Sequence, residues 1–294
     1  MIKEYKADDK FKRWARALQF AYREEVLHDF NEYHAPQVLL SEENAKRGLI
    51  FYEGYRDLIL SKVGNISTQL TANMLRSEHI PYNLFTPLET MPEISTEIFG
   101  EMIGVPIKKI REIKIEYAGD GDKSFYLNDR TSFDTFVRYE TFDGRIGGIG
   151  IEVKYTENEY PLGCKEGKDI AGDNERYRLM TSQSGYYMPD LDIRIFLAAH
   201  HLRQIWRNHI LGYSMKHKGD VEIMHHVHLY PQKNEHFHCH ALPDYRKLLT
   251  EEGNESFKTI TYETYFALLD KYSKNDDITA WVKYLRKRYL GIKQ

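Results

Sequence analysis

The stretch SFDTFVRYETFDGRIGGIGIEVKYTE, residues 132–157, decides the fold that we expect for this chain. Two segments with strand-like alternation flank TFDGR, residues 141–145, and an Asp-Gly pair between two such segments is typical of a hairpin turn. The register of the two strands then matters, because a shift of one residue turns every side chain of a strand to the opposite face.

Two registers compete. A two-residue loop at Asp143 and Gly144 would place Asp134 opposite Val153, and polar and apolar side chains would mix on both faces. A three-residue loop, 142–144, with Gly144 left-handed in a type I turn plus bulge, gives one apolar face. The facing pairs in that second register are Phe133 with Val153, Thr135 with Ile151, and Val137 with Ile149. We predict the second register.

The other face of the predicted hairpin carries reactive groups. Asp134 lies opposite Glu152, and Lys154 follows two residues along the same strand, while Phe136 and Arg138 lie over Gly150 and Gly148. Two carboxylates and an ammonium on a surface where glycines allow close approach predict a site for a hard cation such as Mg²⁺. A main-chain carbonyl and substrate phosphate would complete its ligands, and the lysine could orient or help deprotonate a water. The alternative is a solvated strand face with a Glu-Lys pair.

The acidic-x-Lys tripeptide alone is not specific. It also occurs at Glu4/Lys6, Asp8/Lys10, Glu112/Lys114 and Glu166/Lys168. Only Glu152/Lys154 combines a strand with apolar alternate positions, a hairpin partner and an acid placed opposite. We therefore centre the prediction of function on this pair.

The composition is that of an ordinary globular protein of 294 residues with a net charge of -3, so DNA binding would need a local basic surface or a bound metal. Two cysteines, Cys164 and Cys239, do not make a disulfide framework. The start of the sequence lacks a signal-peptide pattern, and no segment has the length and apolarity of a membrane span. These features predict a cytoplasmic protein with no membrane association.

The remaining pattern alternates between helices and strands. We expect helices at 9–29, after Ser41, and at 67–78, where Pro81 stops the third, then a linker at 87–92 and a short helix at 94–103. We further expect a strand at 109–119, the hairpin, a mobile flap at 160–188, a helix at 190–215, a strand at 221–230, and helices at 245–251, 262–272 and 278–289. The central order is helix, three strands, helix, strand.

That order, with an acid on the second strand and Glu-x-Lys on the third, resembles the PD-(D/E)xK nuclease superfamily and its restriction-endonuclease-like fold. The blocks NMLRS (73–77), YNLF (82–85), LNDRTSFD (127–134), GIEVKYTE (150–157) and QIWRNH (204–209) resemble a bacterial group of predicted restriction endonucleases within it. The resemblance spans about residues 11–290. Phe133 stands where the superfamily name has proline.

The resemblance implies an α/β protein with an αβββαβ core, a mixed central sheet flanked by helices, and helical additions at both ends. We divide it into an N-terminal helical region that includes the first core helix (1–86), the core sheet and helix (87–242), and C-terminal helices packed on the core (243–294), within one compact domain.

The resemblance also implies the roles of the site residues. Asp134 and Glu152 would be metal ligands together with the carbonyl of Val153, and Lys154 would position the attacking water. Glu78, at the end of the third predicted helix, is a candidate further ligand, as many superfamily members use an acid from the first core helix; the alternative is a solvated helix end. Gln204 and Arg138 are candidate substrate-binding residues, and a packing or solvated role for Gln204 remains open.

A second cluster competes for a metal. Residues 225–240, HHVHLYPQKNEHFHCH, carry six histidines and Cys239. His226 and His228 would share one face of a strand and His225 the other, and His236, His238 and His240 would align if that segment were extended. We rank a zinc site here below a set of exposed histidines of which one or two are buried.

The sequence therefore predicts a Mg²⁺-dependent endonuclease that hydrolyses DNA phosphodiester bonds, with Mn²⁺ as a substitute metal. A homodimer is compatible with double-strand cleavage. The alternatives are a nucleic-acid or protein-binding module on the nuclease fold and a zinc protein centred on 225–240.

Overall fold

The computed structural model describes residues 5–30, 38–63, 71–159, 175–273 and 275–292. Its strands are β1 (Lys109–Tyr117), β2 (Phe133–Glu140), β3 (Ile146–Val153), β4 (Ile223–Tyr230) and β5 (Phe257–Thr261). The α-helices are α1 (Lys10–Glu25), α2 (Glu42–Lys46), α3 (Arg56–Val63), α5 (Ile80–Phe85), α6 (Pro92–Ile103), α8 (Glu175–Gln183), α9 (Arg194–Ala198), α10 (His200–Lys218), α11 (Leu242–Arg246), α12 (Glu251–Ser256), α13 (Tyr262–Tyr272) and α14 (Asp276–Leu285). Short 3₁₀ segments are η1 (Glu53–Tyr55), η2 (Thr86–Thr90) and η3 (Lys123–Phe125), and π-helical segments are η5 (His236–Ala241) and η6 (Arg286–Leu290). None of the described helices is long and apolar enough to cross a membrane.

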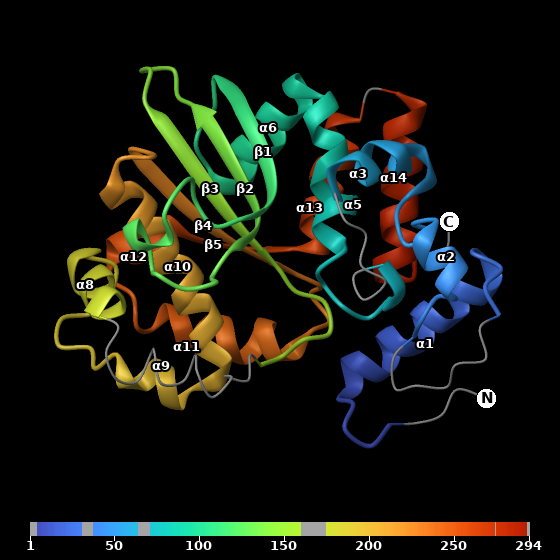
Figure 1. Ribbon diagram of the computed structural model, residues 1–294, viewed down its shortest axis with the longest axis horizontal. Coiled ribbons are helices and arrows are strands. Elements are labelled where there is room, and N and C mark those ends of the chain that lie inside the picture. Colours follow the sequence, from blue (N-terminus) through green and yellow to red (C-terminus); the bar gives the residue numbers. More distant parts are fainter. Residues whose placement is uncertain (1–4, 31–37, 64–70, 160–174, 274, 293–294) are drawn as a thin grey trace.

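The five strands form one mixed sheet in the order β1-β2-β3-β4-β5 (Figure 1). The β1/β2 and β2/β3 pairs are antiparallel, and the β3/β4 and β4/β5 pairs are parallel. The antiparallel β2/β3 pair needs only a tight turn, whereas the parallel β3/β4 pair requires the long crossover that contains α10. The expected order of helix, three strands, helix and strand is confirmed in α6, β1, β2, β3, α10 and β4. The helix that directly precedes β1 is α6, which lies after residues 1–86, where the first core helix was expected, and β5 adds a strand that the pattern did not predict.

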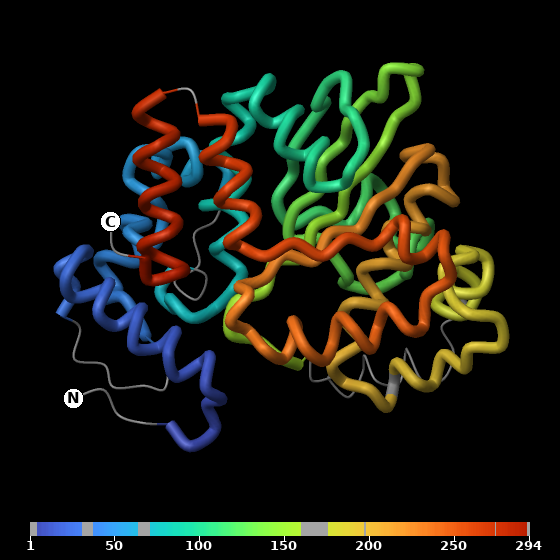
Figure 2. Tube along the Cα trace, turned by 180° about the vertical axis from the view of Figure 1, so that it is seen from behind, coloured from blue at the N-terminus to red at the C-terminus, as the bar shows by residue number. Residues whose placement is uncertain are grey.

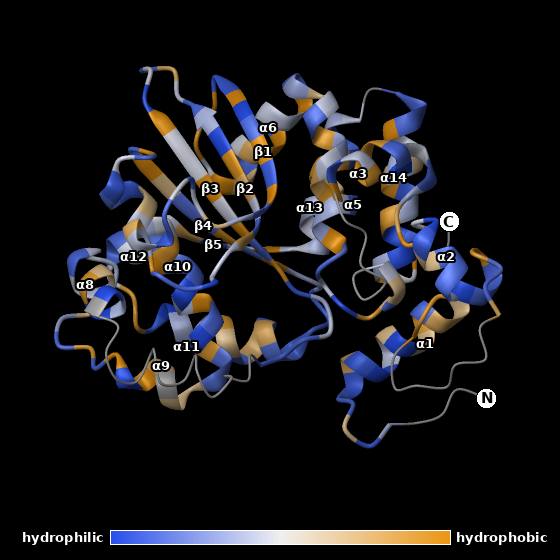
Figure 3. Ribbon diagram, in the orientation of Figure 1, coloured by the Kyte–Doolittle hydropathy of each residue, from blue (hydrophilic) through white to orange (hydrophobic). Residues whose placement is uncertain are grey.

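Helices cover both faces of the sheet. On one face α5, α6 and α13 contact the strands, and on the other α10 and α12 do so. Each face has its own apolar cluster, the first containing Val137, Ile149 and Ile151 and the second containing Phe136 and Trp206. Orange segments recur along the strands and the helices beside them in Figure 3. The alternation of β2 therefore buries one set of side chains on each face.

The two ends of the described chain lie side by side. α1 contacts η6, and Figure 2 shows α1 beside the C-terminal helices. The Gln19 side chain donates hydrogen bonds to the Tyr155 hydroxyl (2.9 Å) and to the Arg288 carbonyl (2.8 Å), and all three residues are buried. α1 is thereby fixed against both the C-terminus and the segment that follows β3.

The predicted register of the hairpin is confirmed. Thr135 pairs with Ile151, Val137 with Ile149, and Phe136 and Arg138 with Gly150 and Gly148. Gly144 has φ +89°, and the main chain of Thr141 bonds to that of Arg145 (3.0 Å), which encloses a three-residue loop. A left-handed glycine at this position lets a type I turn follow the twist of the strands.

Two details of the hairpin prediction are wrong. Phe133 joins the second apolar cluster with Phe136 instead of the face of Val137. The glycines are also not open to a ligand, because a Cβ atom at Gly150 would lie 2.3 Å from the Phe133 ring and one at Gly148 would lie 2.9 Å from the Phe136 ring. The aromatic rings of β2 fill the space that the missing side chains of β3 leave.

Two helix predictions are also wrong in part. The described part of 67–78 contains an isolated bridge between Leu39 and Asn73, and the Asn73 Oδ1 atom accepts from the Leu75 N–H (3.0 Å), so this side chain competes with a helix. Pro81 begins α5 instead of stopping a helix. The predicted helix at 190–215 is divided at Ala199 into α9 and α10. Most of the predicted flap, 160–174, lies outside the described residues, and 175–183 forms α8.

Candidate active site

The expected acid pair lies where β2 and β3 end their pairing. Thr135 and Ile151 form the last pair of the ladder, and Asp134 and Glu152 are the next residues. The Asp134 Oδ2 atom accepts a hydrogen bond from the Val153 N–H (2.6 Å), so the carboxylate closes the end of the ladder in place of a main-chain carbonyl. This bond fixes the Asp134 side chain at the start of the segment that carries Lys154.

Lys154 lies against Glu152. Its main-chain N–H donates to the Leu229 carbonyl (2.8 Å), which continues the pairing with β4 beyond the end of β3. Its Nζ atom is 2.5 Å from Glu152 Oε1, and the side chains of Lys154 and Glu152 are only 8% and 1% exposed. The ion pair is therefore largely shielded from solvent, where its attraction is much stronger than at a surface.

Helix α10 supplies two amides that hold the ion pair. Gln204 Nε2 donates to Glu152 Oε1 (2.6 Å), while Gln204 Oε1 accepts from Lys154 Nζ (2.8 Å). Asn208 Nδ2 donates to the second oxygen, Glu152 Oε2. Gln204 and Asn208 are four residues apart and therefore share one face of the helix. Gln204, a candidate substrate-binding residue, thus contacts the ion pair directly, and the sequence pattern gave Asn208 no role.

The electrostatics of the two acids differ from those of ordinary carboxylates. Burial, followed by repulsion from Glu152, raises the pKa of Asp134 well above its usual range. Burial also raises the pKa of Glu152, although Lys154 and Asn208 oppose the shift. Burial disfavours the charge of Lys154, but the carboxylates of Glu152, Asp134 and Glu157 outweigh it and raise the lysine pKa. Lys154 alone therefore does not compensate the negative charge of the neighbouring acids. A bound cation would compensate the rest.

The donor set fits a cation that prefers oxygen. Among the described residues, no group of three or more His, Cys, Asp or Glu side chains is arranged to hold a metal ion. Two carboxylates nevertheless suffice for Mg²⁺, which keeps several waters and takes one or two protein carboxylates together with substrate phosphate. Asp134 and Glu152 therefore fit Mg²⁺ better than a metal that needs a closed protein cage.

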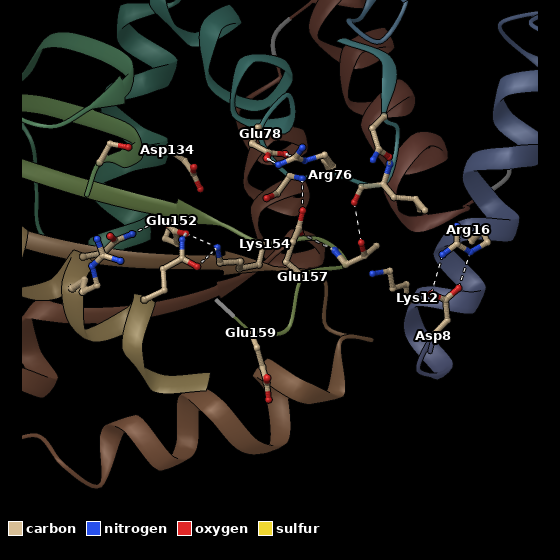
Figure 4. A pocket seen from close by; sticks show the side chains of 18 of the residues that line it. Asp8, Lys12, Arg16, Arg76, Glu78, Asp134, Glu152, Lys154, Glu157 and Glu159 are labelled. Atoms are coloured by element: carbon tan, nitrogen blue, oxygen red, sulfur yellow. Dashed lines mark hydrogen bonds and ion pairs between the residues drawn. The ribbon is translucent and has the colours of Figure 1, made fainter. Parts of the chain in front are cut away.

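These groups line a cavity of about 890 Å³. Figure 4 shows Asp134, Glu152 and Lys154 on one side of it and Asp8, Lys12 and Arg16 of the α1 region on the other. Glu157 lies between them and accepts from the Ser77 N–H (2.7 Å), which attaches the 73–78 segment to the end of β3. The cavity is therefore bounded by the sheet, the 73–78 segment and α1.

Glu116 is a cavity-lining acid on the strand predicted at 109–119, and the sequence pattern gave it no role in a site. Ile115 pairs with Thr135 and Tyr117 with Phe133, so Glu116 lies on the rung of Asp134. It accepts from the Ser132 hydroxyl (3.2 Å), and the surrounding protein and then Glu152 raise its pKa. Three acids on three adjacent strands thus face one cavity. The sequence did not determine the register between β1 and β2, and this register is what places Glu116 in the site.

The two other candidates have different positions. Glu78 lines the cavity but precedes α5 instead of ending a helix, and it is paired with Arg76. Arg138 is not among the cavity-lining residues; its Nε atom lies 2.8 Å from Glu112 and an Nη donates to the Asp220 carbonyl. The structure therefore brings Glu78 to the site but not Arg138, because Arg138 is held by β1 and by the connection between α10 and β4.

The histidine cluster is split. His225, His226 and His228 are all buried on β4, more than expected, and His226 and His228 share a face as predicted. His236, His238 and His240 lie on the π-helical η5 and not on an extended segment, so the condition for their alignment is not met. His238, Cys239 and His240 are exposed. The cluster therefore does not converge on a point within the described residues.

A sequence model of the PD-(D/E)XK nuclease superfamily matches residues 6–291. The chain belongs to this superfamily. None of the curated proteins and none of the solved structures compared with the chain matches it. Membership indicates a nuclease on the restriction-endonuclease-like fold, and the mixed sheet between two layers of helices agrees with that fold.

Proposed function

We propose that this PD-(D/E)XK nuclease is a metal-dependent endonuclease that hydrolyses DNA phosphodiester bonds at Asp134, Glu152 and Lys154. The observation that carries the proposal is the buried contact of Lys154 with Glu152 beside Asp134, at the end of a cavity. Mg²⁺ is the proposed cofactor, with Mn²⁺ as a substitute.

Each site residue has a separate role in the proposed reaction. Asp134, Glu152 and the carbonyl of Val153 would hold a divalent cation, which would polarise the phosphate and stabilise the charge that develops on its oxygens. The Lys154 ammonium contacts Glu152 and donates a hydrogen bond to Gln204, and in the proposed reaction it would orient the attacking water. Gln204 and Asn208 keep Glu152 and Lys154 in place.

The test is incubation of plasmid DNA with the protein in Mg²⁺, Mn²⁺ or EDTA. We expect cleavage by the wild type with either metal, no cleavage in EDTA, and loss of cleavage in Asp134→Ala and Lys154→Ala. Lys114→Ala is the matched control, because Lys114 belongs to the same acidic-x-Lys pattern, with Glu112 at 3.3 Å, but does not line the site cavity. Equal cleavage by all variants would overturn the proposal. DNA binding without any cleavage would instead favour a binding module.

A further inference from the structure

The wall opposite the acids carries positive charge. Lys12 lies in the first turns of α1, whose N-cap is Asp9, and lines the same cavity as Asp134 and Glu152 (Figure 4). Arg130 lines the cavity from the sheet side, four residues before Asp134. The cavity therefore places cations on both of its sides.

Lys12, Arg130 and a third lining residue, Lys6, differ from the other cations that line the cavity. Arg16 is paired with Asp8 (2.7 Å), Arg76 with Glu78, Lys154 with Glu152, and Arg207 with Asp129. Within the described parts of the chain, the Lys12 and Lys6 ammonium groups and the Arg130 guanidinium have no ion-pair or hydrogen-bond partner. A polyanion that approached the acids would be repelled unless such charges bound its phosphates.

The shape of the cavity limits what can reach the acids. Glu152 and Lys154 are nearly inaccessible to solvent, so they lie at the bottom of the cavity of about 890 Å³. On the α1 side, Asn158 Nδ2 donates a hydrogen bond to Asp9 Oδ2 (2.5 Å), which links the segment after β3 to the N-terminus of α1. A flexible single strand can bend into such a recess and bring a phosphate to the buried groups more readily than a stiff base-paired duplex.

We propose that the substrate reaches this site as a single strand of nucleic acid, with Lys12 and Arg130 each binding a backbone phosphate on the two sides of the cavity. This inference rests on the proposed nuclease function and adds the substrate class and two substrate-binding residues. The shared chemistry is a phosphodiester strand, which DNA and RNA both supply.

The test is a binding titration in EDTA, where metal-dependent cleavage does not interfere. Labelled single-stranded DNA, single-stranded RNA and duplex DNA of one sequence are titrated with wild type, Lys12→Ala and Arg130→Ala at several salt concentrations. Lys10→Ala is the matched control, since Lys10 is exposed on the same helix but does not line the cavity. We expect a single strand to bind at least about tenfold more tightly than the duplex. Each cavity variant should lower the slope of log K against log salt by about 0.7, the value for one phosphate contact on a single strand.

Duplex binding equal to or tighter than that of both single strands would overturn the inference, and so would Lys12→Ala and Arg130→Ala variants with the slope of Lys10→Ala. A parallel wild-type reaction with Mg²⁺ separates this failure from failure of the proposed function. Cleavage of duplex in preference to single strands overturns only the single-strand inference. Absence of cleavage, with selective single-strand binding that the cavity variants lose, overturns only the proposed nuclease activity.

Discussion

At the scale of single residues, Lys154 compensates for the charge of two acids. Its ammonium contacts Glu152, and the carboxylates of Asp134 and Glu157 also raise its pKa. Asp134 is left with an elevated pKa because Lys154 offsets its burial and the repulsion from Glu152 only in part. Lys154 therefore competes with a divalent cation for Glu152 while it also serves the proposed reaction.

This competition can be measured. In Lys154→Met the acids lose their internal cation, so we expect Mn²⁺ to bind about tenfold more tightly, equivalent to about 1.4 kcal/mol, while cleavage is lost. Calorimetric titration of Mn²⁺ measures the affinity without activity. Lys114→Met, at the corresponding pair on β1, should bind Mn²⁺ as the wild type does. Unchanged or weaker Mn²⁺ binding in Lys154→Met would show that the lysine does not oppose the cation.

Asn208 gives a second test at this scale. It is buried and donates to Glu152 Oε2, so Asn208→Ala should leave that oxygen free to turn. We expect Mn²⁺ affinity and the cleavage rate to fall by about 10–100-fold, as for other groups that orient a metal ligand. The midpoint of thermal unfolding serves as the control for folding. Loss of stability with unchanged Mn²⁺ affinity would mean that Asn208 only packs.

Part of this site could be predicted from the sequence and part could not. Asp134, Glu152 and Lys154 lie within one hairpin, so alternation and turn chemistry are enough to bring them together. Glu116 joins the site through the register of β1 with β2, and Asn208 joins it through the orientation of α10 about its own axis. Both the register and the orientation depend on tertiary packing, which the local sequence does not indicate.

At the scale of elements, the hairpin is organised by its turn. Gly144 has φ +89°, and no atom lies within 4 Å of the position that a Cβ atom would take there. A side chain at this position would therefore meet a conformational cost but no clash.

We expect Gly144→Ala to lower the free energy of unfolding by about 1–2 kcal/mol, the cost of left-handed backbone for an L-residue. Gly144→Asn should lose less, because asparagine tolerates this conformation. Urea denaturation of the two variants provides the measurement. An alanine variant as stable as the wild type, or less affected than the asparagine variant, would exclude this role for the turn.

The elements also show where pattern reasoning fails. The β2/β3 register could be predicted because a shift would mix polar and apolar faces. The expected helix at 67–78 was wrong because Leu39 and Asn73 pair across more than thirty residues of chain, and the Asn73 side chain caps its own backbone. The predicted position of Phe133 was wrong because Gly150 has no side chain, and the Phe133 ring packs over it on the other face of the sheet.

At the scale of the whole molecule, the sheet separates two apolar clusters, and one of them surrounds buried histidines. His209, His226 and His228 are buried, His226 stacks on Phe257, and His209 bonds to Tyr245 and Ser256. Burial lowers the pKa of His226 to about 3 and that of His225 to about 4. The fold therefore keeps these imidazoles neutral where the unfolded chain would protonate them.

The sign of the pH effect follows from these shifts. Since the folded pKa of His226 is depressed, its stabilising contribution is present above about pH 6.5 and is lost as the pH falls toward 3. Because His226 is protonated in the unfolded chain but not in the folded protein, we expect it alone to lower the free energy of unfolding by about 2 kcal/mol when the pH falls from 7 to 5. Chemical denaturation of wild type and His226→Phe at both pH values measures the difference, which should be smaller in the variant. An equal loss in both proteins would assign the acid sensitivity to other groups.

The order of elements could be predicted at this scale, and the association of the chain ends could not. Helix and strand periodicity predicted the order of the core elements from α6 to β4. The contacts of Gln19 with Tyr155 and Arg288 join residues far apart in the chain, and only the folded arrangement shows that α1 forms a wall of the active-site cavity.

The most direct measurement of the central claim is the Mg²⁺-dependent cleavage rate of Glu152→Gln relative to Glu112→Gln. Both substitutions remove the acid of an acidic-x-Lys pair, Glu112 on β1 and Glu152 on β3, the two strands that flank β2, but only Glu152 lines the cavity beside Asp134. We expect Glu152→Gln to lower the rate by at least about 100-fold and Glu112→Gln to leave it unchanged. Equal rates in the two variants would contradict the assignment of Glu152, Asp134 and Lys154 as the catalytic site.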